Sequence, residues 1–425
     1  MTVTSISIEQ QGQAARKASR ELARASTEAR NAALSAIAFG LEERVDEVLL
    51  ANREDIAAAG RAGQDFHITE RMTLDRDRVA SMAAAVRTIE GLPDPVGEII
   101  EKRTMPNGLD IERVRVPLGV IGVIYESRPN VTVDIASLCL KSGNAVILRG
   151  GKEAIRTNTV LARIARDGVE AAGLPGDAVQ FVESTDRTLV KKMLEMDKYI
   201  DLLIPRGSAE LVHMVAENAT MPAVTGGIGV CHTYVDAAAD TGKAVEIVFN
   251  AKVQRPTVCN ALDTVLVHAE AAPRFLPVMA GRFAAAGVEM RVDKRALALI
   301  GPKKKGAIVK LAESSDFGQE FLALVASVRV VDSFEDAIEH IETYGSGHSE
   351  AIVTDDAATA ERFLREVDAA AVFANASTRF NDGGEFGFGA EVAISTNKLH
   401  ARGPMGLREI CSYKWVVRGD GHVRG

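Results

Sequence analysis

The sequence predicts an α/β protein with two doubly wound lobes and a small β-hairpin. Its 425 residues exceed the roughly 250 to 300 at which a single hydrophobic core stops growing, so two large lobes are expected. From residue 120 onward, apolar runs alternate with helical periods, a pattern typical of parallel sheets covered by helices. Before that point, the dipeptide Asn107-Gly108 separates two extended runs, which indicates a hairpin.

The first hundred residues are predicted to be helical. Apolar side chains recur at intervals of three and four over residues 34–48 and again over residues 79–89, where the stripe ends at Gly91. This spacing places each set on one face of a helix. Such stripes pack into a core, so we assign them no chemistry.

The hairpin covers residues 98–116, EIIEKRTMPNGLDIERVRV. Asn107 and Gly108 both tolerate positive φ, so we expect them at the two centres of a tight turn. A charged two-stranded ribbon buries too little apolar surface to be stable alone. We therefore expect it to pair with the last strand, Tyr413 to Val417, or with another subunit.

Two series of strands and helices follow the hairpin. The first series contains the strand-like runs VIGVI, AVIL, AVQFV and YIDLLI, and its helix over residues 153–172 ends at a stop signal, Gly173 followed by Pro175. The second series begins near residue 260 and contains TVLVH, VEMRV, SVRVV, AIVT and AAVFAN. We expect the boundary between the two lobes near residues 246–252.

Composition excludes several classes of function. A net charge of −8 argues against binding to nucleic acid, which needs concentrated Lys and Arg. No window approaches the roughly 18 apolar residues of a membrane span, and the first residues do not resemble a secretory signal. The four cysteines, Cys139, Cys231, Cys259 and Cys411, form no C-x-x-C pair, so we expect no metal, no disulfide and a cytoplasmic location. Partners should be small molecules or further copies of the chain.

Two strand-to-helix turns are candidates for a cofactor site. Gly207-Ser208 follows the strand YIDLLI, and the turn after AVIL carries Arg149 and Lys152. The first amides of a helix attract phosphate, and two such turns on one sheet form a crevice. Every α/β protein has several turns of this kind, however, and the usual dinucleotide fingerprint G-x-G-x-x-G is absent.

Cys259 and Asn130 each allow two interpretations. Cys259 is the one cysteine in polar company, with Arg255 four residues upstream. It is either a small buried hydrophobe or a nucleophile whose thiol pKa a nearby cation lowers. Asn130 lies between a proline and a predicted helix, where it is either a helix N-cap or turn residue, or an amide that donates to an oxyanion.

Five stretches together resemble the aldehyde dehydrogenase superfamily and, within it, the gamma-glutamyl phosphate reductase family. They are RVPLGVIGVIYESRPN (115–130), NAKVQRPTVCN (250–260), TYGSGHSEAIVT (343–354), NASTRFNDGGEFGFGAE (375–391) and ISTNKLHARGPMGL (394–407). The resemblance covers essentially the whole chain. It implies an aldehyde dehydrogenase-like fold, with cofactor binding in residues 1–97 and 117–248, catalysis in 249–395, and oligomerisation through 98–116 and 396–425.

The resemblance also implies roles for individual residues. It makes Cys259 the nucleophile and Asn130 the side-chain donor to the oxyanion. The implied cofactor contacts are Gly207 and Ser208 at the phosphates, Arg149 and Lys152 near the adenosine ribose, and Glu320 near the nicotinamide ribose. Arg379, His400 and Arg402 match the family's signature without an assigned role, and because a forked guanidinium suits phosphate or carboxylate we expect them to bind substrate.

The activity implied is reduction of L-glutamate 5-phosphate by NADPH to L-glutamate 5-semialdehyde and phosphate through a cysteine thioester, the second step of proline synthesis from glutamate. Where hydrolytic relatives carry a glutamate as a base for water, this chain reads PAVTGGIGVCH. That difference favours phosphate over water as the acyl acceptor. A hydrolytic NAD-dependent aldehyde dehydrogenase and a silent nucleotide-binding scaffold are the alternatives.

The resemblance leaves the choice between NADPH and NADH open. It further implies a homo-oligomer, with Trp415 near the contact, and a transient contact with glutamate 5-kinase.

Overall fold

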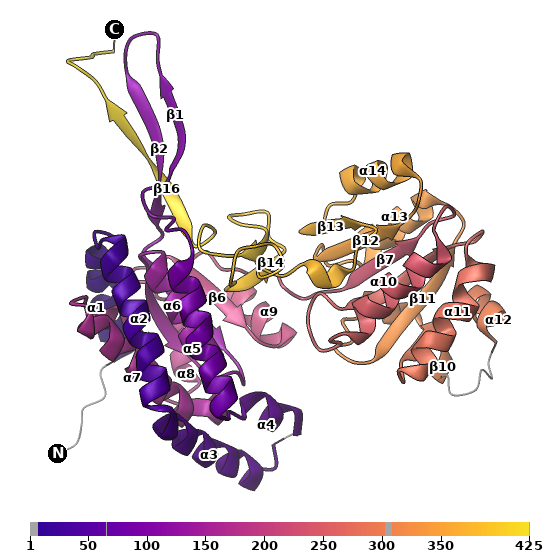
Figure 1. The fold of residues 1–425 in the computed structure, drawn as a ribbon, viewed down its shortest axis with the longest axis horizontal. Helices are drawn as coiled ribbons and strands as arrows, with labels where there is room; N and C mark the ends of the chain where they lie inside the picture. The colour runs from indigo at the N-terminus through magenta and orange to yellow at the C-terminus, as the bar shows by residue number, and fades with distance from the viewer. Residues whose placement is uncertain (1–6, 65, 302–307, 425) are drawn as a thin grey trace. The chain divides into compact units, whose positions relative to one another are not determined.

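A computed structural model describes residues 7–64, 66–301 and 308–424 of the chain (Figure 1). These residues form two compact units. Unit 1 contains the chain up to Thr225, Gly387–Ala393 and the segment from Met405 onward, and unit 2 contains Gly226–Phe386 and Ile394–Pro404. Two lobes were predicted from chain length and pattern, and that prediction is confirmed.

Unit 1 is built on a four-stranded parallel sheet with the order β5-β4-β3-β6. Its strands are β3 (Val120–Tyr125), β4 (Ala145–Arg149), β5 (Val179–Phe181) and β6 (Leu202–Arg206). Every residue of β3 and β4 is buried, because a parallel sheet is covered on both faces. The carboxyl ends of β4, β3 and β6 meet at one edge, which is where ligands bind in open parallel sheets.

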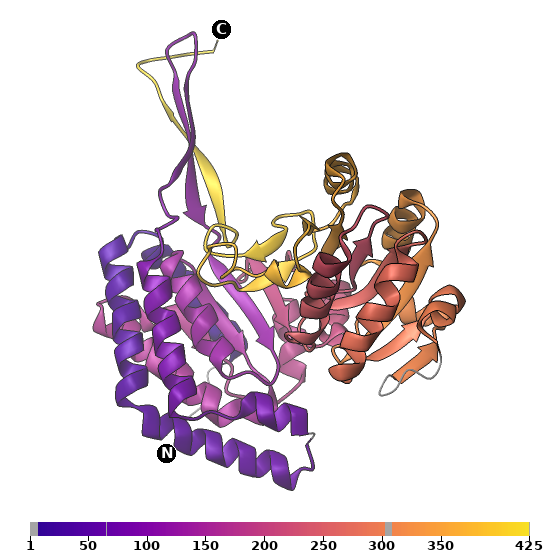
Figure 2. The same cartoon turned by 45° about the vertical axis from the view of Figure 1, so that its right-hand side comes forward.

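Helices cover the sheet of unit 1 (Figures 1 and 2). The predicted apolar stripe of residues 34–48 is divided between two helices, because α2 ends at Glu43 and α3 begins at Val45. α2 packs against α5 and α7. No helix among the described residues is long and apolar enough to cross a bilayer. The helices are α1 (Ile8–Leu22), α2 (Thr27–Glu43), α3 (Val45–Arg61), α4 (Phe66–Met72), α5 (Arg76–Gly91), α6 (Asn130–Lys141), α7 (Ile155–Ala171), α8 (Thr188–Leu194) and α9 (Ala209–Asn218).

A three-stranded antiparallel ribbon extends from unit 1, drawn in purple and yellow in Figures 1 and 2. It consists of β1 (Ile99–Thr104), β2 (Asp110–Pro117) and β16 (Cys411–Arg418), with β2 in the middle. The predicted pairing of the hairpin with the last strand is therefore confirmed. The turn differs from the prediction: of the Asn-Gly pair only Gly108 has positive φ. Its N–H donates to the Met105 carbonyl, and the Met105 N–H donates to the Leu109 carbonyl, which makes a longer loop than a two-residue turn.

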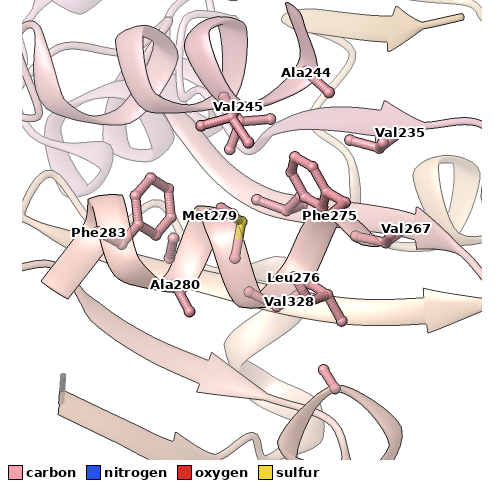
Figure 3. Packing of buried hydrophobic residues seen from close by; sticks show 14 of the residues in the cluster. Val235, Ala244, Val245, Val267, Phe275, Leu276, Met279, Ala280, Phe283 and Val328 are labelled. Atoms are coloured by element: carbon pink, nitrogen blue, oxygen red, sulfur yellow. The ribbon is translucent and has the colours of Figure 1, made fainter. Parts of the chain in front are cut away.

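Unit 2 is built on a seven-stranded parallel sheet with the order β10-β9-β11-β8-β7-β12-β13. Figure 3 shows how its helix α11 (Ala272–Ala285) directs Phe275, Met279 and Phe283 toward Val245 and Val328. The strands are β7 (Cys231–Val235), β8 (Leu262–His268), β9 (Glu289–Val292), β10 (Ile308–Leu311), β11 (Val325–Val331), β12 (Ser349–Val353) and β13 (Ala371–Ala374). The other helices are α10 (Thr241–Val253), α12 (Lys294–Ile300), α13 (Phe334–Tyr344) and α14 (Ala357–Glu366).

The boundary between the units lies earlier than predicted. We expected the first lobe to continue to residue 248, but β7 pairs with β8 on one side and with β12 on the other. Both partners belong to the second sheet, so unit 2 begins at Gly226. The ribbon and the end of the chain are part of unit 1, and β14 (Ala393–Ser395) pairs with β15 (Gly403–Met405) where the chain passes between the units.

Candidate active site

Cys259 lies in unit 2, in the loop between the end of α10 and the start of β8. It is half-buried, whereas Cys139, Cys231 and Cys411 are buried. Burial raises the pKa of all three of these thiols, that of Cys411 to about 12. Of the four cysteines, Cys259 alone is both accessible and surrounded by polar loop residues, as its sequence context predicts.

Two residues that sequence reasoning did not select contact the backbone carbonyl of Cys259. The Cys231 thiol donates a hydrogen bond of 3.2 Å to the Cys259 carbonyl oxygen. Gly229 lies so close to the same carbonyl that a Cβ atom there would be 1.6 Å from the oxygen. Only glycine permits this approach. The run Gly226-Gly227-Ile228-Gly229 was the available signal, because clustered glycines mark sites where backbones approach closely.

Glu320 lies beside the same loop. Its Oε1 accepts a 3.0 Å hydrogen bond from the N–H of Gly229, the residue that contacts the Cys259 carbonyl. Burial raises the pKa of Glu320 to about 7, and the Gly229 N–H partly opposes that rise. The structure thus brings the predicted nicotinamide-ribose ligand and the predicted nucleophile into one part of unit 2.

A buried ion pair supports this region. Lys252, in the last turn of α10, is 0% exposed, and its Nζ lies 3.6 Å from Oδ1 of Asp263 on β8. Asp263 also accepts hydrogen bonds from the backbone N–H groups of Phe321 and Cys231. Burial lowers the pKa of Lys252 and raises that of Asp263 to about 6. Sequence reasoning missed the pair; a lysine between Ala251 and Val253, near the end of a largely apolar helix, was its signal.

Arg379 lies on the other side of the Cys259 loop. Its Nε donates to Oε1 of Gln254 at 2.8 Å, and its Nη1 donates to Oδ1 of Asn260. Asn260 in turn donates to the Asn381 carbonyl at 2.9 Å. Gln254 and Asn260 flank Cys259 in the sequence, so the guanidinium joins the two ends of the loop that carries the thiol.

The other two predicted substrate residues have different surroundings. Arg402 donates to the side chain and to the backbone carbonyl of Asp368, and Lys398 pairs with the same carboxylate. These cations lower the pKa of Asp368 to about 2. The charge of Arg402 is therefore already neutralised within the protein. His400 is exposed.

Asn130 is the first residue of α6 in unit 1. The helix cap is Pro129, and it makes no side-chain capping hydrogen bond, so Asn130 is not the N-cap of α6. Its Nδ2 donates to Oδ2 of Asp134 at 2.7 Å. Burial raises the pKa of Asp134 to about 6. An amide nitrogen carries two hydrogens, and Asp134 accepts one of them.

The two predicted cofactor turns lie at the same edge of the unit 1 sheet. Ser208 caps α9 by accepting from the Leu211 N–H, and its own N–H donates to Glu126, the residue that follows β3. A Cβ atom on Gly207 would lie 2.3 Å from the Glu126 carboxylate. Sequence reasoning did not select Glu126, a carboxylate placed where the amides of a helix end attract anions.

The second turn follows β4. Arg149 is buried and donates through Nη1 to the Gly150 carbonyl, and its Nε has no hydrogen-bond partner among the described residues. Lys152, in the short helix Lys152–Ala154, is exposed. This edge of the sheet therefore presents two cations and a helix N-terminus, and the Glu126 carboxylate is bound at that N-terminus.

The chain is similar to known proteins over nearly its full length. The aldehyde dehydrogenase family matches residues 2–313 and 311–416. A gamma-glutamyl phosphate reductase of Roseiflexus castenholzii is 56% identical over 421 residues, which cover 98% of this chain and 99% of that protein. The crystal structure of gamma-glutamyl phosphate reductase from Thermotoga maritima has a TM-score of 0.95 and 44% identity, covering 98% of this chain and 99% of that one.

A more distant structure is similar in fold. An engineered glycolyl-CoA reductase with bound NADP+ has a TM-score of 0.69 at 16% identity, covering 96% of each chain. The family match and the close relatives lead to one conclusion. The chain belongs to the aldehyde dehydrogenase family, and it is similar to the gamma-glutamyl phosphate reductases from end to end.

Proposed function

We propose that this protein reduces L-glutamate 5-phosphate to L-glutamate 5-semialdehyde with NADPH and releases phosphate, the second step of proline biosynthesis from glutamate. Relatives more than half identical to it are gamma-glutamyl phosphate reductases. The observation that carries the proposal is the Cys259 loop, which presents the one partly exposed cysteine and is held by Cys231, Gly229 and Arg379.

In the proposed reaction the Cys259 thiolate attacks the acyl carbon and the bond from that carbon to the phosphate oxygen breaks. Phosphate leaves and a thioester remains on the sulfur. The negative charge that develops on the acyl oxygen would be stabilised by the Cys259 backbone N–H and the second amide hydrogen of Asn130. Bound NADPH would supply a hydride to the acyl carbon, and the carbon–sulfur bond would then break to release the aldehyde and the Cys259 thiolate.

The residues present fit a nicotinamide cofactor. The phosphates would lie at the N-terminus of α9, where the Ser208 N–H now donates to the Glu126 carboxylate and would have to exchange it for a phosphate oxygen. The Glu320 carboxylate can accept from the hydroxyls of a ribose. Arg149, with a buried Nε that lacks a partner, and the exposed Lys152 provide positive charge suited to a 2′-phosphate. These two cations are why we propose NADPH over NADH.

Phosphate as the acyl acceptor is supported by the segment that precedes Cys231. Residues 222–228 read PAVTGGI and contain no carboxylate that could activate water. In the reverse reaction phosphate attacks the thioester, and this segment supplies no base that would let water attack in its place.

We also propose a homo-oligomer formed through the ribbon. Trp415 and Val417 on β16 are 45% and 54% exposed, and Arg103 lies 5.3 Å from the Trp415 ring in a cation–π contact. β16 forms an edge of its three-stranded sheet, and an exposed apolar edge strand tends to pair with another chain. Contact with glutamate 5-kinase and a cytoplasmic location stay predictions.

The test is the oxidation of glutamate semialdehyde with NADP+ or NAD+, each with and without phosphate. We expect turnover that requires phosphate, prefers NADP+ and is lost in Cys259→Ala. Oxidation that proceeds equally without phosphate would show a hydrolytic enzyme and overturn the proposal, and absence of turnover under all four conditions would show a silent protein.

A further inference from the structure

Arg379 is a cation held by neutral groups. Its guanidinium donates to the amide oxygens of Gln254 and Asn260, and no carboxylate among the described residues lies within ion-pair distance. The charge of Asp382 acts on Arg379, but that carboxylate accepts instead from the Gly384 N–H. A guanidinium has five N–H donors in a fixed fork, so donors and the full positive charge remain for a ligand.

Five of the other arginines of unit 2 differ in this respect, whereas Arg274 and Arg329 also have neutral partners, backbone carbonyls and His340. Arg282, Arg291, Arg295, Arg362 and Arg402 each form an ion pair with an aspartate or glutamate. Arg379 is partly buried, and burial lowers its pKa. A partly buried charge without a counter-ion costs free energy that an anionic ligand recovers. Because this guanidinium also lies beside the Cys259 loop, it is suited to binding an anionic ligand there.

A second cation accompanies it. Arg255 lies in the same loop, is exposed and has no carboxylate partner among the described residues. Its charge acts on Arg379, whose pKa it lowers further after burial. Two neighbouring guanidinium groups suit a doubly charged phosphate better than a singly charged carboxylate.

The substrate of the proposed function has two anionic groups, a phosphoryl group and an α-carboxylate. The position of Arg379 indicates which of them it binds. Arg379 binds Asn260, the residue directly after Cys259, so it lies beside the nucleophile. The phosphorus of the acyl phosphate is separated from the attacked carbon by a single oxygen, whereas the α-carboxylate lies at the far end of the carbon chain. The group next to the sulfur during attack is the phosphoryl group.

Resting on the proposed function, we infer that Arg379 and Arg255 bind the phosphoryl group of the substrate, and inorganic phosphate in the reverse reaction. In the reverse direction a phosphate oxygen bonds to the thioester carbon, the carbon–sulfur bond breaks, and the Cys259 thiolate is released. The arginines stabilise the phosphate on both sides of this exchange, and the α-carboxylate is bound elsewhere.

The experiment measures oxidation of glutamate semialdehyde with NADP+ while phosphate and aldehyde are varied separately. Arg379→Ala should raise the KM for phosphate roughly 10- to 100-fold, the loss expected for a charged hydrogen-bonding partner, and leave the KM for the aldehyde within about twofold. Arg379→Lys should recover part of the effect because it restores the charge without the fork. Arg255→Ala should raise the KM for phosphate less, because that side chain is exposed.

The matched control is Arg362→Ala on α14, which removes the same charge from a pair with Glu335 and Glu366 and should change neither KM. A second readout needs no turnover: inorganic phosphate should slow alkylation of Cys259 by iodoacetate in the parent and not in Arg379→Ala. A higher KM for the aldehyde with an unchanged KM for phosphate would assign Arg379 to the α-carboxylate and overturn the inference. A parent without phosphate-dependent turnover would instead overturn the proposed function.

Discussion

The carboxyl group of Glu320 should make unit 2 less stable as pH rises. Burial raises its pKa from 4.5 to about 7, so between these values the folded protein keeps a proton that the unfolded chain has released. Stability is linked to pH through the difference in bound protons. When the folded state binds more protons, the free energy of unfolding falls as pH increases, and the loss is complete above pH 7. The shift corresponds to about 3 kcal/mol, and partial exposure of the side chain reduces this to roughly 2 kcal/mol.

Glu320→Gln removes the titration while keeping the size of the side chain. The difference in free energy of unfolding between the variant and the parent should therefore grow by roughly 2 kcal/mol, in favour of the variant, as pH rises from 5 to 8. Urea unfolding followed by circular dichroism measures this, because the single tryptophan, Trp415, lies in unit 1 and fluorescence would not report on unit 2. Glu342→Gln, an exposed glutamate on α13, is the control and should leave the pH profile unchanged. Parallel profiles for parent and Glu320→Gln would refute the reasoning.

Three further outcomes follow from the site. Cys259→Ala should abolish turnover, while Ala at each of the other three cysteines should cost only roughly 1 to 2 kcal/mol of stability; more than a few per cent activity in Cys259→Ala would contradict the covalent mechanism. Lys252→Met should destabilise the protein by roughly 3 to 5 kcal/mol, because it leaves the buried carboxylate of Asp263 without a counter-ion. Adding Asp263→Asn should recover most of that loss in the same denaturation assay. Asn130→Ala should lower kcat about 100- to 1,000-fold with little change in KM, and a pure rise in KM would return Asn130 to a structural role.

The sequence by itself determined the features that depend on local pattern. The alternation of apolar runs and helical periods predicted both sheets, because side chains that face a core repeat with the period of their element. The charged hairpin and its pairing with the last strand followed from the Asn107-Gly108 turn and an otherwise unstable ribbon. Cys259 stood out because its neighbours in the chain are polar, which is also a local property.

The tertiary structure alone decided what depends on partners distant in the chain. β7 belongs to the second sheet because it hydrogen-bonds to β8 and β12. The local sequence of a strand does not show which strands it pairs with. Lys252 and Asp263 are an ion pair because two elements bury them together. Arg379 and Arg402 look alike in the sequence, yet one lies against neutral amides and the other against Asp368. Whether a charge is free to bind a ligand depends on its surroundings in space, and these are set by the packing of the whole unit.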